Sequence, residues 1–304
     1  MTVTVIIPTY KPDGTFQKLI EKLKTQTYPI KKILILNTEA KYWKKDWIKG
    51  IPQAEVHHIT KEEFDHGKTR AMGAAMAETD LLVFFTQDAV PANNKVIEVL
   101  VNSFADDSIG AAYGRQLPAA DCKFIEQYTR GFNYPENSRV KRKEDLPKLG
   151  IKTYFCSNVC AAYRRCVYEK LGGFVTKTIF NEDMIYAGNL VKAGYGIAYT
   201  ADAEVYHSHN YTAIEQFHRN FDLGVSQAEH PEIFDEVPSE GEGLRLVKKT
   251  FVYLVKQGRF WLVPKLIVQS GAKYAGYFMG KRYKKLPEKL IRICTMNPSY
   301  WEKK

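Results

Sequence analysis

The sequence predicts an α/β protein with a mostly parallel central sheet, and two observations support this class. Over the first 115 of the 304 residues, apolar strand-like runs alternate with amphipathic segments of helical period. Strands joined by helices in this way are typical of a parallel sheet that is covered on both faces. The composition, 45% hydrophobic and 26% charged, is that of an ordinary folded protein, which excludes disorder and repeat arrays as first interpretations.

Five apolar runs in this region are expected to form the strands. They are Val3–Ile7, Ile33–Leu36, Glu55–Ile59, Leu81–Phe85 and Gly110–Tyr113. Helical patterns lie between them, near Gly14–Thr25, Gly67–Ala77 and Lys95–Phe104. Because ligands of parallel sheets bind at the carboxyl ends of the strands, we expect the chemistry of this protein directly after these runs.

Residues 119–152 interrupt the alternation and carry the charged stretch Arg139–Asp145. We expect a mobile insertion or an acceptor-side loop here. Two further helices are expected at residues 164–171 and 182–192, the second capped by Asn181. A last strand-like run then leads into a pair of histidines.

The end of the chain is strongly basic. Residues 245–304 contain 15 lysines and arginines but two acids, a net charge of +13, whereas the first 244 residues sum to −3. Within residues 244–259, apolar side chains occupy one arc of a helical wheel and basic side chains share a neighbouring arc of about 100°. The basic set is Arg245, Lys248, Lys249, Lys256 and Arg259. We expect this tail to bind an anionic membrane surface; the alternative is a group of helices that pack on the body with an ordinary solvated face.

The cysteines and the apolar segments indicate in which cellular compartment the protein works. The five cysteines form no Cys-x-x-Cys pair, so a disulfide framework or zinc module is not expected and a reducing compartment is favoured. The N-terminus lacks the basic start and apolar core of a signal peptide, and no stretch of about 18 residues is free of charge. We therefore expect a cytoplasmic protein.

Asp88 follows the most hydrophobic run of the body. A carboxylate there is costly unless its charge is compensated, and a divalent metal bound to a diphosphate would do so. His207 and His209 alternate along a strand end, so both imidazoles face one side and could complete the metal site. The alternatives are a turn residue that caps the next helix and a pair of surface histidines without function.

Two helix starts carry further candidates. Glu182 and Asp183 lie in a first turn, where one carboxylate facing a substrate hydroxyl could act as a general base. At His66–Arg70, free backbone amides with Lys68 and Arg70 could hold phosphate oxygens. The alternative for Glu182 and Asp183 is that the helix dipole alone favours carboxylates in a first turn. The alternative for Lys68 and Arg70 is an ordinary solvated basic face of the helix.

Taken in order, these segments resemble a family 2 glycosyltransferase of the GT-A fold, and within that family a bacterial rhamnosyltransferase. The resemblance covers about residues 2–212. It rests on seven segments in the family's order: Val5–Tyr10, Phe64–Arg70, Thr86–Ala89, Ser157–Arg165, Gly172–Phe174, Asn181–Asp183 and His207–Tyr211.

The resemblance implies roles for these positions. Asp183 matches the catalytic base of inverting members, and Asp88 matches the last aspartate of the motif that binds a metal–diphosphate, with Mg²⁺ or Mn²⁺ as cofactor. His207 resembles the family's late metal- or phosphate-binding histidine, with His209 beside it. The implied donor-binding residues are Pro8, Thr9, Tyr10, Asn37, Glu39, Lys68, Arg70, Gln87, Asp88, Ser157 and Asn158.

Two positions depart from the family pattern. Thr86 stands where the first acid of the metal motif is usual, and Asn37 stands where an aspartate is usual after the second strand. A site with fewer carboxylates is expected to hold its metal weakly, or only together with the nucleotide. The Thr86–Ala89 form itself resembles rhamnosyltransferases that use dTDP-L-rhamnose.

The expected protein is an inverting transferase that moves L-rhamnose from dTDP-L-rhamnose to a lipid-linked saccharide in cell-surface polysaccharide synthesis. It would be peripheral on the inner face of the cell membrane and would not bind nucleic acid. Residues 1–240 would form the GT-A domain, with a nucleotide-binding half (1–115) and an acceptor and catalytic half (116–240), and residues 241–304 the basic tail. Two alternatives stay open: a transferase of the same fold that uses a UDP-hexose, and a non-catalytic polyanion-binding protein on a degenerate transferase body.

Overall fold

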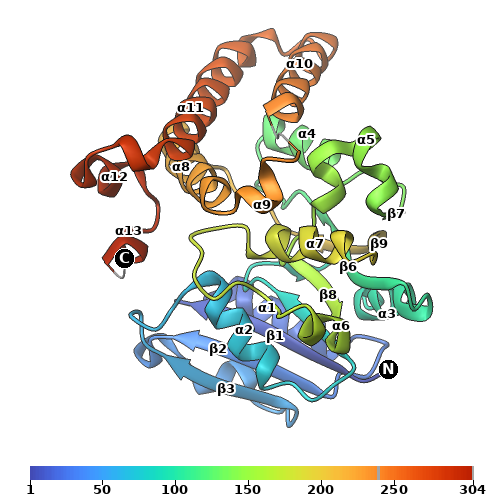
Figure 1. The fold of residues 1–304 in the computed structure, drawn as a ribbon. Coiled ribbons are helices and arrows are strands. Elements are labelled where there is room, and N and C mark those ends of the chain that lie inside the picture. The colour runs from blue at the N-terminus through green and yellow to red at the C-terminus, as the bar shows by residue number, and fades with distance from the viewer. Residues whose placement is uncertain (238–239, 303–304) are drawn as a thin grey trace. The chain divides into compact units, whose positions relative to one another are not determined.

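A computed structural model describes residues 1–237 and 240–302, which form two compact units (Figure 1). Unit 1 comprises Met1–Ala120, Tyr134–Lys177 and Glu182–Ser208. Unit 2 comprises Asp121–Asn133, Thr178–Asn181 and His209–Lys304.

Unit 1 is built on one mixed sheet, which in the described residues has nine strands in the order β3-β2-β1-β4-β8-β6-β9-β5, with β7 beside β9. Pairings among β1 to β4 and between β6 and β9 are parallel, while β8 runs antiparallel to β4 and β6. The bounds are β1 Val3–Tyr10, β2 Lys32–Thr38, β3 Ala54–Ile59, β4 Leu81–Phe85, β5 Val90–Pro91, β6 Ile109–Leu117, β7 Arg139–Lys141, β8 Cys160–Arg164 and β9 Gly196–Tyr206. The expected α/β class and its five expected strands are confirmed.

The two faces of this sheet are covered by different helices because side chains alternate along each strand. Val5 and Ile7 of β1 pack in the core with Phe16 and Leu19 of α1. On the other face, α2 approaches so closely that a Cβ at Gly73 would lie 2.5 Å from Ile6 Cγ2. The helical segments of unit 1 are α1 Gly14–Lys24, η1 Ala40–Tyr42, η2 Lys45–Ile48, α2 His66–Ala75, α3 Val96–Asn102, η3 Ser103–Ala105, η4 Lys143–Asp145, α5 Leu146–Leu149, η5 Gly150–Tyr154, α6 Arg165–Lys170 and α7 Glu182–Lys192.

Residues 119–152, expected as a mobile insertion or an acceptor-side loop, contain regular secondary structure. The middle of this range forms β7, which pairs antiparallel with β9. Lys141 is only 2% exposed: its ammonium lies 4.7 Å from the ring centre of Tyr113 and donates to the backbone carbonyls of Lys152 and Phe155. A run of charges indicates a solvated loop only where the charges stay in water, and here carbonyl oxygens and an aromatic face replace the water.

Unit 2 is helical. Its segments are α4 Phe124–Asn133, α8 Ala213–Glu229, α9 Pro231–Phe234, α10 Glu240–Lys256, η6 Phe260–Leu262, α11 Val263–Lys281, η7 Tyr283–Lys285, α12 Glu288–Cys294 and α13 Pro298–Glu302. Glycines let α8 and α11 pack backbone to backbone, because a Cβ at Gly276 or Gly280 would overlap the carbonyl oxygen of Phe217 or Phe221. Phe221 and Val225 of α8 also belong to the small hydrophobic core of unit 2.

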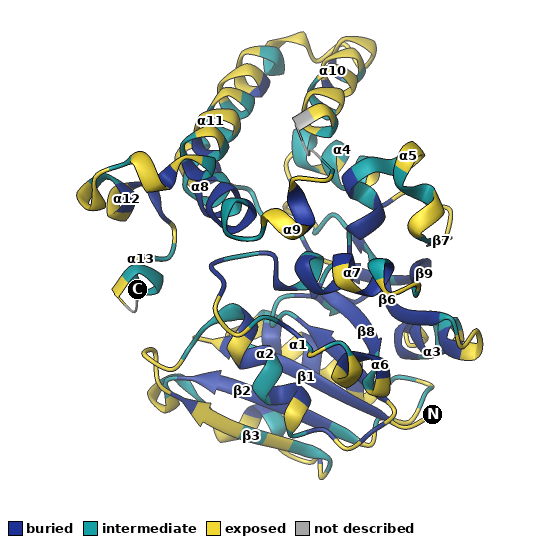
Figure 2. Cartoon of the chain, in the orientation of Figure 1, coloured by how far each residue is buried: buried dark blue, intermediate teal, exposed yellow. Residues whose placement is uncertain are grey.

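The helix expected over residues 244–259 is confirmed as α10, which ends at Lys256 and leaves Arg259 beyond it, and much of α10 is exposed (Figure 2). Phe251 and Val255 are 46% and 51% exposed, and in η6 Phe260 and Trp261 are 69% and 62% exposed. The opposite side of α10 packs within unit 2, where the ring of Tyr253 stacks on Phe124 and Tyr128 of α4. Within residues 1–237 and 240–302, no helix is long and apolar enough to cross a membrane.

All five cysteines are free thiols. Cys122, Cys156, Cys160 and Cys294 are buried, whereas Cys166 on α6 is exposed. Burial raises the pKa of Cys156 to about 12. The four buried thiols act as small core side chains.

Candidate active site

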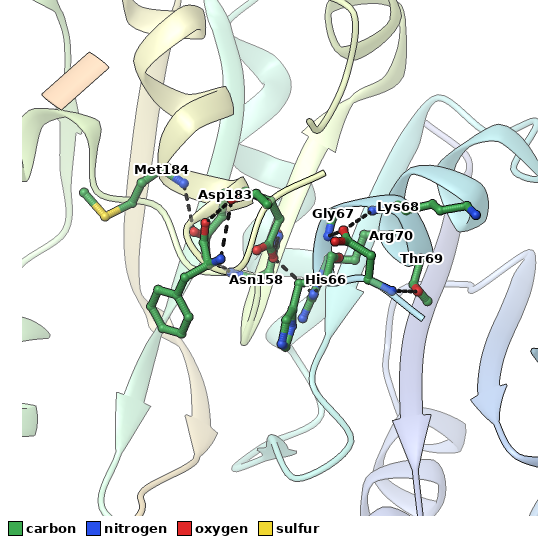
Figure 3. Close-up of polar contacts among 12 residues, drawn as sticks. His66, Gly67, Lys68, Thr69, Arg70, Asn158, Asp183 and Met184 are labelled. Atoms are coloured by element: carbon green, nitrogen blue, oxygen red, sulfur yellow. Dashed lines mark hydrogen bonds and ion pairs between the residues drawn. The ribbon is translucent and has the colours of Figure 1, made fainter. Parts of the chain in front are cut away.

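A pair of carboxyl groups opens α7 (Figure 3). Asp183 accepts the backbone N–H of Asn158 at Oδ2, at 3.0 Å, and that of Met184 at Oδ1, at 2.8 Å. Glu182 is 6% exposed, and its Oε1 accepts from the side-chain amide of Asn158 and from Arg70 Nη1, each at 3.1 Å. The two carboxyl groups are therefore adjacent in the chain but have different partners.

These surroundings separate the pKa values of the pair. Burial, and then the negative charge of Glu182, raise the pKa of Asp183 to about 7. Burial would also raise the pKa of Glu182, but the Arg70 guanidinium, His66 and the Asn158 amide together outweigh it and lower that pKa. Glu182 thus stays ionised while Asp183 exchanges a proton near neutral pH, the property a general base requires.

Asn158 holds both carboxyl groups. It follows η5, is 2% exposed, and uses its backbone N–H for Asp183 and its side-chain amide for Glu182. The hydroxyl of Tyr163 on β8 donates to Asn158 Oδ1 at 2.8 Å and fixes the orientation of that amide. The family resemblance implies that Asn158 binds the donor; in the structure its described contacts orient the carboxyl pair.

The start of α2 differs from its expected form. Free backbone amides were expected there, but Asp65 caps the helix and accepts from Gly67 N–H and Lys68 N–H at 2.8 and 3.0 Å. Arg70 is 7% exposed and pairs with Glu182, so its guanidinium is directed to the carboxyl pair. Lys68 is exposed, and its side chain extends away from the pair in Figure 3.

The carboxyl ends of β1, β2 and β4 meet through side-chain hydrogen bonds. Thr9 Oγ1 donates to Asn37 Oδ1 at 3.1 Å, both buried. Gln87, directly after β4, accepts from Tyr10 N–H at 2.8 Å and donates to the Tyr10 carbonyl at 3.1 Å. The structure thus brings four of the expected donor-binding residues to one edge of the sheet, with Pro8 one residue before Thr9 on β1.

Glu39 lies at the same edge in a strained conformation. Its φ is 68°, which is uncommon for a residue other than glycine. Its carboxylate accepts the backbone N–H of Lys61 at 3.2 Å and pairs with Lys41 at 2.8 Å. These contacts, first the one to Lys41, lower the pKa of Glu39, which keeps an ionised carboxylate at the end of β2.

Hydrogen bonds join Ser157, Gln116 and His207, and His207 in turn faces Asp88. Gln116 Nε2 donates to Ser157 Oγ at 3.1 Å, which leaves Gln116 Oε1 facing His207 Nδ1 at 3.0 Å. Because an amide oxygen accepts, this contact places a ring N–H at Nδ1 of His207 and leaves Nε2 as the nitrogen that faces Asp88. Nε2 lies 3.5 Å from Asp88 Oδ2, so an imidazole nitrogen and a carboxylate oxygen, both atoms that bind metal ions, face each other. That arrangement fits a divalent cation, with Gln116 as the partner that orients the histidine.

His209 belongs to unit 2, and in that unit its ring stacks on Tyr211 with centroids 5.0 Å apart. Within unit 1, the expected metal ligands that lie together are Asp88 and His207.

Sequence reasoning missed two residues of this site. Gln116 is 3% exposed on β6, and Tyr163 is fully buried on β8. Gln116 reads as an ordinary strand residue because its partner His207 lies 91 residues away, whereas Tyr163 lies in the Ser157–Arg165 segment, whose pattern does not indicate that it contacts Asn158. A buried glutamine in an otherwise apolar strand was the one available signal for Gln116.

Two solved structures share this fold. The mannosyltransferase PcManGT from Pyrobaculum calidifontis, solved in complex with GDP-Man and Mn²⁺, matches 98% of this chain and 84% of its own, with a TM-score of 0.57 and 16% identity. S. aureus TarS 1-349 matches 94% of this chain and 91% of its own, with a TM-score of 0.55 and 14% identity. At these identities the likeness shows the fold alone, and it confirms the expected GT-A class.

Sequence comparison defines the class of protein: the chain is a glycosyltransferase. Residues 4–172 match the family model described as Glycosyl transferase family 2, and the chain belongs to that family. The O-antigen chain rhamnosyltransferase RfbN of Salmonella typhimurium is 40% identical over 303 residues, which cover 99% of this chain and 96% of the relative. The O-antigen chain rhamnosyltransferase WbaN of Salmonella anatum is also 40% identical, over 98% of this chain and 95% of its own. The expected enzyme class and family are confirmed.

Proposed function

We propose that this enzyme transfers L-rhamnose from dTDP-L-rhamnose to a lipid-linked saccharide, with inversion, in the synthesis of a cell-surface polysaccharide. The names of the two 40% identical relatives support the sugar and the process. The observation that carries the chemistry is the Asp183 carboxyl, held by two backbone N–H groups and poised near neutral pH beside the ionised Glu182.

In this mechanism Asp183 removes the proton from an acceptor hydroxyl. The freed oxygen forms a bond to the anomeric carbon of the sugar while the bond from that carbon to the diphosphate oxygen breaks, and the configuration inverts. Arg70, through Glu182, keeps a fixed charge beside Asp183 and so sets its basicity. Glu182 and Asn158 act as positioning residues, because their described contacts are to the carboxyl pair.

Asp88 and His207 would hold a divalent ion, Mg²⁺ or Mn²⁺, with Gln116 orienting the histidine. Such an ion would neutralise the negative charge that develops on the leaving diphosphate. His209 stays a candidate ligand from the sequence.

We propose that the donor binds along the sheet edge described above. The residues that would bind the nucleoside are Pro8, Thr9, Tyr10, Asn37, Glu39 and Gln87. Lys68 and Arg70 would lie on the nucleotide side, and Ser157 would border the sugar.

We also propose a cytoplasmic enzyme that is peripheral on the inner face of the cell membrane. Residues 1–240 would carry the transferase function, and residues 241–304 would bind anionic lipid. Support comes from the exposed Phe251, Val255, Phe260 and Trp261 beside the basic side chains of α10. Apolar surface next to lysines is what an in-plane membrane segment presents, with each basic residue contributing about 1 kcal/mol near anionic lipid.

A thermal-shift screen of the full chain tests the donor. The panel is dTDP-L-rhamnose, dTDP, UDP-glucose and UDP-galactose, each with Mn²⁺, with Mg²⁺ and with EDTA. A selective ligand stabilises the native state, so dTDP-L-rhamnose with metal should raise the melting temperature most. A larger shift with a UDP-hexose would transfer the assignment to that donor. No shift with any sugar nucleotide, together with salt-dependent binding of nucleic acid, would favour a polyanion-binding protein.

A further inference from the structure

Lys141 is a buried cation that the proposed mechanism does not use. It is the last residue of β7 and is 2% exposed. Its ammonium donates to the backbone carbonyl of Lys152 at 3.1 Å and to that of Phe155, and lies 4.7 Å from the ring centre of Tyr113. An ammonium is costly to remove from water, and hydrogen bonds to carbonyls recover part of that cost. These contacts show which part of the chain the charge holds in place.

The carbonyl of Phe155 begins a short stretch of chain, residues 155–158, which we call the 155–158 segment. At its start, Lys141 holds this carbonyl. At its end, the segment is fixed by the central sheet, because the N–H of Thr86 donates to the carbonyl of Val159 at 3.2 Å and β8 begins one residue later. The 155–158 segment therefore lies between Lys141 and the sheet.

Both halves of the candidate active site are hydrogen-bonded to the 155–158 segment. The backbone N–H of Asn158 donates to Asp183 Oδ2 at 3.0 Å (Figure 3). The hydroxyl of Ser157 accepts from Gln116, and Gln116 in turn contacts His207. A displacement of the segment would therefore change the surroundings of the carboxyl pair and of the histidine.

Contacts within the segment link its two ends. The ring of Phe155 packs edge-on against Tyr113, with centroids 5.6 Å apart. Cys156 Sγ lies 3.5 Å from the hydroxyl of Tyr163, and that hydroxyl donates to Asn158 Oδ1 at 2.8 Å. Because the segment is short and held by these contacts, loss of the bond at Phe155 should alter the position of Asn158.

We propose that Lys141 is a positioning residue of the transfer reaction: by holding the carbonyl that begins the 155–158 segment, it keeps the N–H of Asn158 directed at Asp183. This assignment rests on the proposed role of Asp183 as the base. Lys141 acts through the backbone of the segment. Its hydrogen bonds are charge-assisted and therefore stronger than those between neutral groups.

Hydrogen exchange of the full chain tests the anchor and requires no reaction. Lys141→Met removes the N–H donors and keeps a side chain of similar length. Amides of the peptide that contains Asn158 should exchange about tenfold faster, because loss of these bonds raises the population of the open segment. Exchange is measured at mildly acidic pH, since burial lowers the pKa of Lys141 to about 7 and the ammonium is charged below that value.

The peptides of β1 and β4 report on the fold in the same experiment. They should exchange at the parental rate in Lys141→Met. An unchanged rate at Asn158 would overturn the proposal, and equally faster exchange of every peptide would assign Lys141 to the stability of the whole unit instead. Lys141→Arg keeps a cation with N–H donors and should restore most of the protection.

Arg164→Met is the matched control. Arg164 lies on β8 with 13% of its side chain exposed, and its guanidinium donates to the backbone carbonyls of Phe104 and Ile109 at 2.9 and 3.2 Å. Its loss should lower the melting temperature and leave exchange at Asn158 unchanged. Equal acceleration at Asn158 in both Met variants would mean that losing any such cation loosens the segment, which would overturn the specific role of Lys141.

Titration of the Asp183 carboxyl gives a second readout. Burial and the charge of Glu182 raise its pKa to about 7, and the N–H of Asn158 and the charge of Arg70 act against them. Burial also raises the pKa values of the nearby Cys156 and Tyr163, so both stay neutral.

Weakening the Asn158 bond in Lys141→Met should raise the pKa of Asp183 further, by about half a pH unit. NMR of labelled aspartate carboxyls measures this pKa, with Asp183→Asn to assign the signal. A raised pKa with parental exchange at Asn158 would reflect the lost charge alone and overturn the proposal.

Turnover separates this proposal from the proposed reaction. Hydrolysis of dTDP-L-rhamnose by water, followed as release of dTDP, needs no other acceptor. In Lys141→Met, kcat should fall about tenfold while the KM for the donor stays within about threefold, because the base is displaced and the donor-binding sheet edge is not. If Asp183→Asn hydrolyses the donor as fast as the parent, the proposed base is wrong, and exchange at Asn158 still decides whether Lys141 positions the segment.

Discussion

Two cations of unit 2 have surroundings that differ from those of the buried charges of unit 1. In unit 1, Arg70 pairs with Glu182, Asp183 accepts two backbone N–H bonds, and Lys141 donates to backbone carbonyls. In unit 2, Lys273 and Arg219 have no carboxylate partner among the described residues. Charge balanced within the protein is arranged in advance for a reaction, whereas charge left unbalanced favours the binding of an anion. The comparison predicts that substitutions in unit 1 alter turnover and that substitutions in unit 2 alter attachment to lipid.

The largest effect is expected from reversing the charge of the tail. Changing Lys248, Lys249 and Lys256 together to Glu should abolish binding to anionic vesicles, with a summed change of about 6 kcal/mol before screening by salt. Flotation at low salt is the measurement, and the matched control is the same reversal at Lys18, Lys22 and Lys31, exposed lysines of unit 1. A parent protein that stays unbound to anionic vesicles would assign the tail to structure or to another partner.

The next effect concerns the base. Asp183→Asn should lower turnover by about 10² or more and leave donor affinity nearly unchanged, because an amide cannot accept the acceptor proton. Steady-state kinetics with donor titration measure both, and Asp202→Asn at an exposed position of β9 is the control. Turnover within a few-fold of the parent would remove Asp183 from the mechanism and contradict the assignment of the reaction to unit 1.

A smaller effect is expected at the metal pair. Asp88→Ala should weaken metal-dependent donor binding about tenfold, because the diphosphate loses its link to the protein through the ion. Thermal shift with dTDP-L-rhamnose, with Mn²⁺ and with EDTA, measures the loss. If the parent runs at full rate in EDTA, the metal role is wrong, and Lys68 and Arg70 become the leading candidates for neutralising the diphosphate.

The smallest effect is a shift along the pH axis. The kcat/KM of the parent should rise with pH up to the pKa of Asp183, about 7, because the base must be deprotonated. Burial and the charge of Glu182 both raise that pKa, so Glu182→Gln removes one cause and should move the acid limb to lower pH. Glu169→Gln, exposed on α6, should leave the limb in place. A limb that does not move in Glu182→Gln would mean that the pair does not titrate as a unit.

Local pattern was enough to predict much of unit 1. The strands at Val3–Tyr10 and Leu81–Phe85 are apolar runs with clear ends, and the helix at Glu182–Lys192 was predicted at the same bounds. Asp183 was found because its segment carries a family motif. Each of these patterns lies within a short segment, so it can be recognised from a single sequence.

Contacts between distant segments could not be predicted. The role of Arg70 toward the nucleotide stays a prediction, but its ion pair with Glu182, 112 residues later in the chain, could not be predicted because nothing in the sequence between them indicates it. Gln116 acquires a role only because β6 and β9 run side by side and bring it to His207. Lys141 looked like a loop residue because its compensating groups are backbone carbonyls, which no sequence pattern marks.

The distribution of the cysteines has a practical consequence for spectroscopy. Cys166 is the one exposed thiol of the five, and the other four lie buried in their units. A maleimide dye added to the native, unmodified chain should attach at a single place on α6, since thiol reagents need both access and thiolate. A single dye at Cys166 would therefore allow binding of the unmodified protein to vesicles to be followed in real time by fluorescence.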